Sequence, residues 1–118
     1  MGYSEVAIKC EEEAYKRFKG TFTEYFQPDE ILKSGDLYVV HWNYVKWYDD
    51  FEEIEKIRKV MDELDDEGVD TGDGLRYSFM RIGEELTDIE TRLNDYALEL
   101  WASRFIDLPQ WEEIETEE

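Results

Sequence analysis

The chain has 118 residues and a mass of 14.2 kDa, a size that fits one domain with one modest core and argues against a multidomain enzyme. Its 32 acidic and 13 basic side chains give a net charge of −19, which makes direct binding to nucleic acid or to an anionic membrane unfavourable. We therefore expect macromolecular partners to be basic. Apolar residues make up 42% of the chain and aromatic ones 15%, enough to fill a core despite the charge.

The amino-terminal half predicts a strand, a helix, a connection and a second strand. Residues 3–10 alternate apolar and polar side chains with the period of two that is typical of a strand. Residues 11–26 begin with glutamates and then space apolar side chains by three and four, which predicts a helix. Turn residues from Pro28 to Asp36 predict a connecting segment. The β-branched and aromatic run 37–48 predicts the next strand.

A second helix and the connection after it carry close to half of the net charge. Asp49 and Asp50 offer an N-cap, and the apolar stripe of residues 51–64 predicts the helix. Residues 65–74 contain three glycines and predict an exposed connection. From residue 49 to residue 73 there are 12 acidic side chains against three basic ones. Because the apolar stripe must face the core, the acidic side chains of this helix are expected to point outward.

The rest of the chain predicts further strands and completes the fold. Residues 75–83 alternate as a third strand, both a helix and an extended segment fit residues 84–94, and residues 96–106 alternate again as a final strand. This order predicts an α+β domain with a mixed or antiparallel sheet of about four strands and two helices packed on one face. We place this single domain at residues 1–109. Residues 110–118 hold five glutamates and are predicted to form an acidic carboxyl-terminal tail.

The outward carboxylates of the second helix predict a surface for a basic partner. Carboxylates on such a helix are spaced by several ångströms, comparable with phosphates along a duplex. A net charge of −19 also exceeds what solubility requires of a domain this small. We therefore predict that the surface mimics nucleic acid toward a basic protein. The predicted contact residues are Glu52, Glu53, Glu55, Asp62 and Glu63 for charge, with Trp47 and Tyr48 as aromatic anchors.

Aromatic side chains support a second hypothesis from a different class. Trp42, Tyr44, Trp47 and Tyr48 crowd the end of one predicted strand, where alternation of faces prevents all of them from pointing inward. An exposed aromatic patch there would stack on a small ligand such as a nucleotide signal. The cations available for its phosphate are Arg76, Arg81, Arg92 and Arg104.

Catalytic motifs are sparse. Cys10 is the only cysteine and His41 the only histidine, and they would form a thiolate pair only if their strands are adjacent and both side chains share a face. The tripeptide 70–72, Asp-Thr-Gly, matches aspartic proteases but lies in a turn context, and the acidic loop around it misses the ligand spacing of a calcium loop. We predict no enzymatic activity, no cofactor and no metal site, with a small enzyme as a third alternative.

Three segments stand out as motifs. They are residues 1–8 (MGYSEVAI), residues 41–49 (HWNYVKWYD), and residues 79–85 (FMRIGEE) followed by 88–90 (DIE). Together they resemble a group of small bacteriophage and prophage proteins without assigned function, and no functional residues are carried over from that group. The resemblance implies an accessory phage protein, and small acidic proteins of this kind often inhibit host systems such as restriction and CRISPR effectors.

Other features of the sequence fit the cytoplasm of a bacterial host. The amino terminus lacks the basic region and apolar run of a signal peptide, and every apolar stretch is far shorter than the roughly 20 residues that span a bilayer. We therefore predict a cytoplasmic, non-enzymatic inhibitor of phage origin that binds a basic host protein, such as a nucleic-acid-binding defence effector, without direct contact to nucleic acid or membrane. A homo-oligomer is left open.

Overall fold

A computed structural model gives the fold of this chain. The residues whose structure it describes are 3–24, 26–48, 50–67, 75–85, 88–102 and 106–114. The strands are β1 (Tyr3–Glu11), β2 (Glu30–Ser34), β3 (Leu37–Lys46), β4 (Tyr77–Ile82), β5 (Ile89–Leu93), β6 (Trp101–Ala102), β7 (Ile106–Asp107) and β8 (Glu112–Ile114). The helices are α1 (Glu12–Lys19), α2 (Glu52–Glu67) and the short 3-10 helix η1 (Tyr96–Leu98).

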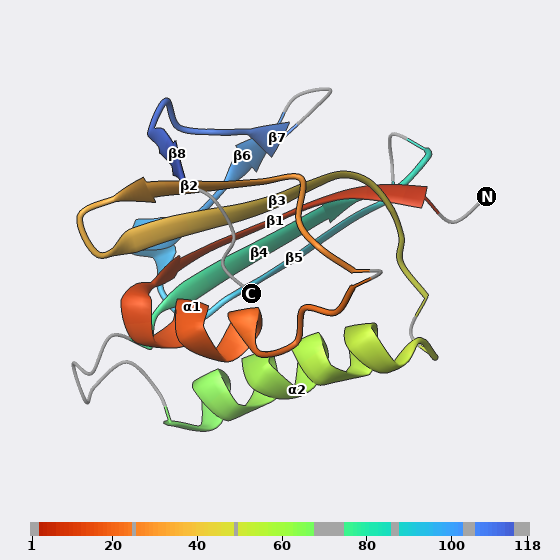
Figure 1. The fold of residues 1–118 in the computed structure, drawn as a ribbon, viewed down its shortest axis with the longest axis horizontal. Coiled ribbons are helices and arrows are strands. Elements are labelled where there is room, and N and C mark those ends of the chain that lie inside the picture. The colour runs from red at the N-terminus through yellow and green to blue at the C-terminus, as the bar shows by residue number, and fades with distance from the viewer. Residues whose placement is uncertain are drawn as a thin grey trace.

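Six of these strands form one sheet, in the order β5-β4-β1-β3-β2-β8. Every neighbouring pair in it is antiparallel. Figure 1 shows α1 and α2 together on one side of this sheet, and β6 and β7 on the other side. The expected α+β class with two helices and an antiparallel sheet is therefore confirmed. The expected number of about four strands is wrong, because the sheet has six.

The additional strands come from segments with weak patterns. β2 occupies the predicted connection after Pro28, and its pairing with β3 runs from Glu30 to Ser34. β8 lies within the predicted tail and pairs with β2, so residues 112–114 belong to the sheet. β5 shows that the undecided segment 84–94 contains a strand, which pairs with β4. These strands have five residues or fewer, too short for alternation to identify them.

The predicted final strand over residues 96–106 is wrong. Residues 96–98 form η1, and β6 and β7 have two residues each and pair with each other, with Trp101 opposite Asp107. Leu98 and Leu100 are buried, at 4% and 5% exposed. The alternation in the sequence reflects the burial of Leu98 and Leu100, which does not require a continuous strand.

The first helix is shorter than predicted. α1 ends at Lys19, and the N–H of Gly20 bonds to carbonyls of the last turn. Phe22 and Phe26 extended the helical pattern in the sequence, yet both lie beyond the helix and pack on the ring of Trp42. The spacing of Phe22 and Phe26 therefore reflects that both rings pack on Trp42, and it does not indicate that the helix continues.

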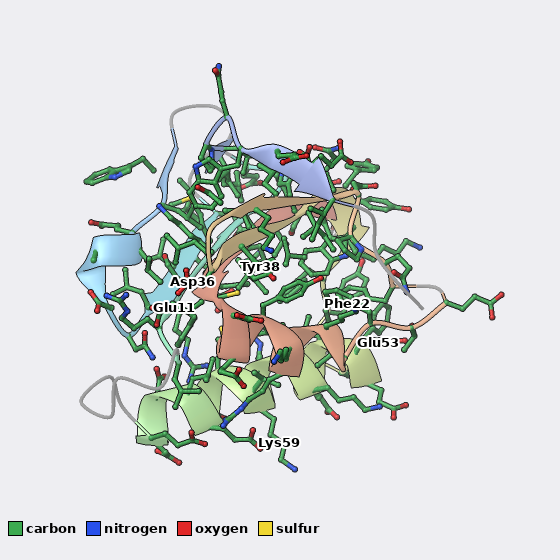
Figure 2. The ribbon with its side chains drawn as sticks, turned by 60° about the vertical axis from the view of Figure 1, so that its left-hand side comes forward. Glu11, Phe22, Asp36, Tyr38, Glu53 and Lys59 are labelled. Carbon is green, nitrogen blue, oxygen red and sulfur yellow. The ribbon has the colours of Figure 1, made fainter. Side chains whose placement is uncertain are left out.

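Alternation along the strands divides the core into two layers. In β1, Val6, Ile8 and Cys10 face the helices, while Ala7 faces the opposite side. The helix-side layer also contains Tyr38, which Figure 2 shows between the sheet and α1. The opposite layer is covered by the carboxyl-terminal segment, whose contributions are Leu100, Ile106, Leu108 and Trp111. Among the described residues, no helix is long and apolar enough to cross a membrane.

Candidate functional site

Cys10 and His41 lie on adjacent strands but on opposite faces of the sheet. Cys10 pairs with Tyr38 and His41 with Ala7 in the β1–β3 register, so their side chains point in opposite directions. Cys10 is fully buried in the helix-side core, and this burial raises the pKa of its thiol. The two residues therefore do not form the thiolate pair that the sequence left open.

His41 is held between two carboxylates. Its Nδ1 lies 3.0 Å from Oε1 of Glu30, and its Nε2 lies 2.8 Å from Oε2 of Glu5. The other oxygen of Glu5 accepts the backbone N–H of Ile106 at 3.2 Å. This bridge joins β1, β2, β3 and β7, so we assign His41 a structural role. In the part of the chain that the structure describes, no group of three or more histidine, cysteine, aspartate or glutamate side chains is arranged to hold a metal ion.

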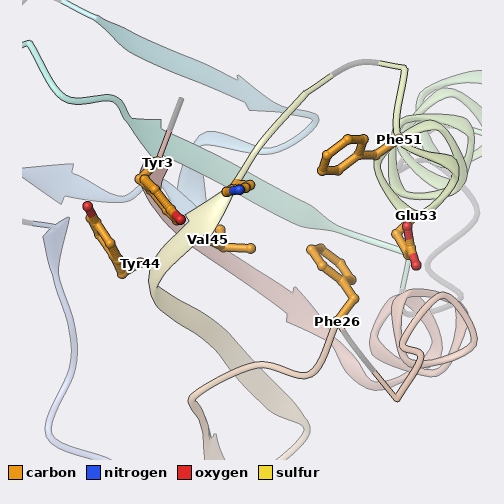
Figure 3. A pocket seen from close by; sticks show the side chains of 7 residues that line it. Tyr3, Phe26, Tyr44, Val45, Phe51 and Glu53 are labelled. Atoms are coloured by element: carbon orange, nitrogen blue, oxygen red, sulfur yellow. The ribbon is translucent and has the colours of Figure 1, made fainter. Parts of the chain in front are cut away.

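An open groove of about 530 Å³ lies where β1 begins and β3 ends. It is lined by Tyr3, Phe26, Tyr44, Val45, Lys46, Phe51 and Glu53. The rings of Tyr3 and Tyr44 stack with centroids 4.2 Å apart, and Nζ of Lys46 lies 5.5 Å from the Tyr3 centroid. Figure 3 shows these two rings on one side of the groove, with Phe51 and Glu53 on the other. A groove of this size and composition fits an aromatic or a long side chain of a partner.

Five of the seven groove residues were not predicted from the sequence, namely Tyr3, Phe26, Val45, Lys46 and Phe51. Tyr3 and Lys46 are far apart in the chain and meet because they pair in the β1–β3 register. Phe51 was assigned to the buried stripe of the second helix, but α2 begins one residue later and Phe51 is 40% exposed. The sequence pointed to this region through the predicted contact residue Glu53 and through the aromatic crowding around Tyr44, which is 68% exposed.

The two predicted aromatic anchors differ in burial. Trp47 is 7% exposed, and its ring packs against Phe26 and Phe79 under the guanidinium of Arg58. Trp47 is therefore a core residue, which corrects its assignment as a surface anchor. The reason is that the β1–β3 register shifts between Ser4 and Val6, so Val45 packs on the helix-side core and Trp47, two residues on, lies on the same side.

Tyr48 remains at the surface. It is 38% exposed, and its ring meets Phe51 edge-on at 5.2 Å between centroids. The expected exposed aromatic patch thus consists of Tyr44, Tyr48 and Phe51, whereas Trp42 is 2% exposed and belongs to the core.

Carboxylates at the amino end of α2 lie beside this patch. Glu52 is 77% exposed and lies 3.2 Å from Nζ of Lys56, one turn along the helix. Glu53 is half-buried and accepts a hydrogen bond from Oγ1 of Thr23. Glu55 is exposed, and no cation of the described residues pairs with it. The positive end of the helix dipole stabilises acids in this first turn, so they need no counter-cation from another element.

Carboxylates at the other end of α2 are paired with arginines from distant elements. Arg92 of β5 donates to Asp62 at 2.5 Å and to Asp65 at 2.8 Å. Arg17 of α1 lies 3.8 Å from Glu63. The last turn of α2 contains no basic residue, so these arginines supply the positive charge that a helix carboxyl end favours. Asp62 and Glu63 therefore help to hold the fold and offer less free charge to a partner than the sequence predicted.

The arginines predicted to bind a phosphate are engaged by carboxylates. Those that the structure describes are Arg76, Arg81 and Arg92. Arg76 donates to Glu11 at 2.7 Å, and Arg81 donates to Glu90 at 3.1 Å. Arg92 donates to the acids of α2. Arg104, the fourth candidate, lies outside the described residues, as does the acidic loop 68–74 with its Asp-Thr-Gly tripeptide.

Two of these contacts lower carboxyl pKa values. The hydrogen bond from Arg76 lowers the pKa of Glu11 below its ordinary value of 4.5. Burial alone would raise the pKa of Glu90, but hydrogen bonds from Arg58 and Arg81 lower it overall. Both carboxylates are therefore stabilised in their charged form within the fold.

Comparison with known proteins gave no family for this chain. No family model, no curated protein and no solved structure matched it. Its function is therefore argued from the chemistry of its own surface.

Proposed function

We propose that this protein is a non-enzymatic inhibitor of phage origin that binds and blocks a basic host protein, such as a nucleic-acid-binding defence effector. The contact surface, which we call the acidic-aromatic end, consists of Glu52, Glu53, Glu55, Tyr44, Tyr48 and Phe51. The observation that carries the proposal is that exposed carboxylates outside the arginine network adjoin exposed aromatic rings and the groove between them.

This combination suits a site rich in lysine and arginine. Carboxylates attract such cations, and the faces of tyrosine and phenylalanine rings bind them when the charge lies within about 6 Å of the ring centroid. Within the protein itself, Lys46 already makes this contact with Tyr3. Aromatic residues also supply much of the binding energy in protein interfaces. A cationic side chain of the partner would therefore find both charge and a ring in the same groove.

The net charge of −19 adds a long-range contribution. It attracts a basic protein before contact and raises the association rate, and salt screens this attraction over about 8 Å at 0.15 M. Binding is therefore expected to weaken as the salt concentration rises.

The direct test uses two charge-reversal variants with the same change in net charge. The test variant is Glu52→Lys, Glu53→Lys and Glu55→Lys. The control variant is Glu12→Lys, Glu13→Lys and Asp36→Lys, which reverses two exposed acids in the first turn of α1 and one exposed acid in the turn between β2 and β3. Circular dichroism and thermal unfolding establish that each variant is folded. Because both variants change the net charge equally, a difference in their binding shows that the location of the acids matters and not only the total charge.

The target is sought by immobilising each protein, adding bacterial host lysate at about 0.15 M salt, and eluting at about 1 M salt, where charge attraction is screened. The proposal expects a basic nucleic-acid-binding protein that the wild type and the control variant retain, that the test variant loses, and that duplex DNA displaces. Equal retention by the test variant, or recovery of background proteins only, would overturn it.

The alternative of a protein that sequesters a nucleotide signal has one supporting observation, the aromatic groove of about 530 Å³. Among the described groove residues, Lys46 is the one cation, and the described arginines proposed for phosphate are already in ion pairs. Native mass spectrometry of the purified protein distinguishes this alternative. A nucleotide that stays bound, and that Lys46→Ala releases, would favour it over the inhibitor.

A further inference from the structure

The two edges of the six-stranded sheet differ in how they resist pairing. β8 is a three-residue strand that includes Glu112 and Glu113, and a short edge with like charges disfavours association. β5 has five residues without proline, glycine or lysine, and its register with β4 is continuous from Ile89 to Leu93. Within the described part of the chain, no strand pairs with its outer side. A regular, unblocked edge of this kind is a template for another strand.

The free backbone groups of this edge can be assigned from its pairing with β4. At one end of the pair, the N–H of Gly83 donates to the C=O of Asp88 at 2.7 Å. At the other end, the N–H of Asn94 donates to the C=O of Tyr77 at 3.2 Å. Bonded and non-bonded pairs alternate along an antiparallel ladder, so Glu90 and Arg92 are the β5 residues that bond to β4. The N–H and C=O groups that point outward belong to Ile89, Thr91 and Leu93.

The side chains of β5 are self-complementary about its central residue. The strand reads Ile-Glu-Thr-Arg-Leu over residues 89–93. If two copies pair antiparallel with Thr91 opposite Thr91, then Ile89 lies opposite Leu93 and Glu90 lies opposite Arg92 on both sides of the two-fold axis. Apolar side chains then meet apolar ones and acids meet bases, which are favourable cross-strand pairs.

Apolar side chains next to this edge are exposed. Ile89 is 48% exposed and Trp101 is 66% exposed. With Leu93 they line a shallow groove of about 220 Å³ on the face of the sheet opposite the helices. A second copy that continues the sheet would bring its own Ile89 and Leu93 onto this groove and remove apolar surface from water.

We propose that this protein forms a two-fold symmetric dimer in which the β5 strands of two copies pair antiparallel, centred on Thr91, and join the two sheets into one. Each copy carries a charge of −19, so long-range repulsion opposes association and salt relieves it. The dimer is therefore expected to strengthen with salt. Binding of a basic partner at the acidic-aromatic end uses other residues and has the opposite salt dependence, so either proposal can fail without the other.

The edge is tested with two disruptive and two control variants. Thr91→Pro removes an outward N–H that β4 does not use, and Ile89→Lys puts a charge on an exposed edge position. Thr91→Val keeps the N–H, and Gln110→Lys puts the same charge on an exposed residue elsewhere. Sedimentation velocity over a range of protein and salt concentrations measures the dimer dissociation constant. Circular dichroism and thermal unfolding identify any variant that fails to fold.

The wild type and both controls are expected to reach twice the 14.2 kDa mass at high salt, and Thr91→Pro is expected to weaken the dimer about tenfold or more. Amide hydrogen exchange of the wild type gives a test that needs no variant. In the dimer the amides of Ile89, Thr91 and Leu93 become protected as protein concentration rises. A wild type that stays monomeric at every salt concentration, or a dimer in which the Thr91 amide exchanges freely, would overturn the proposal.

Discussion

Both ends of α2 carry acids, but in different surroundings. At the carboxyl end, Asp62 and Asp65 are hydrogen-bonded to Arg92, which comes from β5. At the amino end, Glu52 has a partner only within its own helix, and Glu55 has none among the described residues. Figure 2 shows Glu53 at this amino end, while Lys59, in the middle of the helix, points away from the sheet.

The helix dipole explains this difference. Acids are stabilised at an amino end by about 0.3–1 kcal/mol each and are unfavourable at a carboxyl end. The carboxyl end therefore needs cations from elsewhere in the fold, and Arg17 and Arg92 supply them. The amino end needs none, so its carboxylates stay available to a partner. Acids of one helix thus become a structural element at one end and a candidate contact surface at the other.

The largest effect is expected beside the amino end, where a buried and an exposed aromatic residue are neighbours. Trp47→Ala removes a ring that is 7% exposed and should lower the free energy of unfolding by about 3–5 kcal/mol. Tyr48→Ala, at 38% exposed, should cost less than about 1 kcal/mol. Urea denaturation of both variants measures the difference. Similar losses would show that the boundary between core and surface is misplaced here.

At the carboxyl end, Arg92→Gln should lower the free energy of unfolding by about 1–3 kcal/mol, because it leaves Asp62 and Asp65 close together without a cation. The matched change Lys56→Gln removes the exposed partner of Glu52 and should cost about 0.5 kcal/mol or less. Thermal unfolding of the pair provides the comparison. A loss as small for Arg92→Gln as for Lys56→Gln would remove the distinction between the two ends.

Acid should weaken the fold by protonating the carboxylates of the arginine network. The pKa of Glu11 and that of Glu90 are lower in the fold than their ordinary value of 4.5. Their stabilising contribution is thus fully present above about pH 4.5 and is lost as the pH falls through the folded-state values. Unfolding free energies measured from pH 7 downward should decline below about pH 4.5. In Glu11→Gln this decline should be shallower, and an unchanged slope would contradict the assignment.

The smallest effect is expected for Glu55→Gln. This side chain is exposed and has no cation partner among the described residues, so its loss should change the free energy of unfolding by less than about 0.5 kcal/mol. Asp62→Asn, which weakens the contact with Arg92, should cost more. Parallel urea titrations rank the two variants. The reverse ranking would mean that the amino end carries the structural charge.

Long and strongly patterned elements could be predicted from the sequence. β1, β3 and α2 have nine, ten and 16 residues, and each repeats its own period over most of that length. β2 and β8 could not be predicted, since five and three residues show too little of any period and β8 is defined by its partner strand. Phe22 and Phe26 followed a helical spacing, but the helix had already ended.

For the candidate site, the sequence determined which side chains are available and how much charge they carry. It identified the acids of α2 and the aromatic cluster near Tyr44, because composition and local period depend on neighbours in the chain. Only the tertiary structure decided which acids are neutralised, since Arg17 and Arg92 reach α2 from α1 and β5. It also placed Trp47 in the core and brought Tyr3 to Lys46 through strand register. Ion pairs and burial depend on distances between residues far apart in the chain, and folding sets those distances.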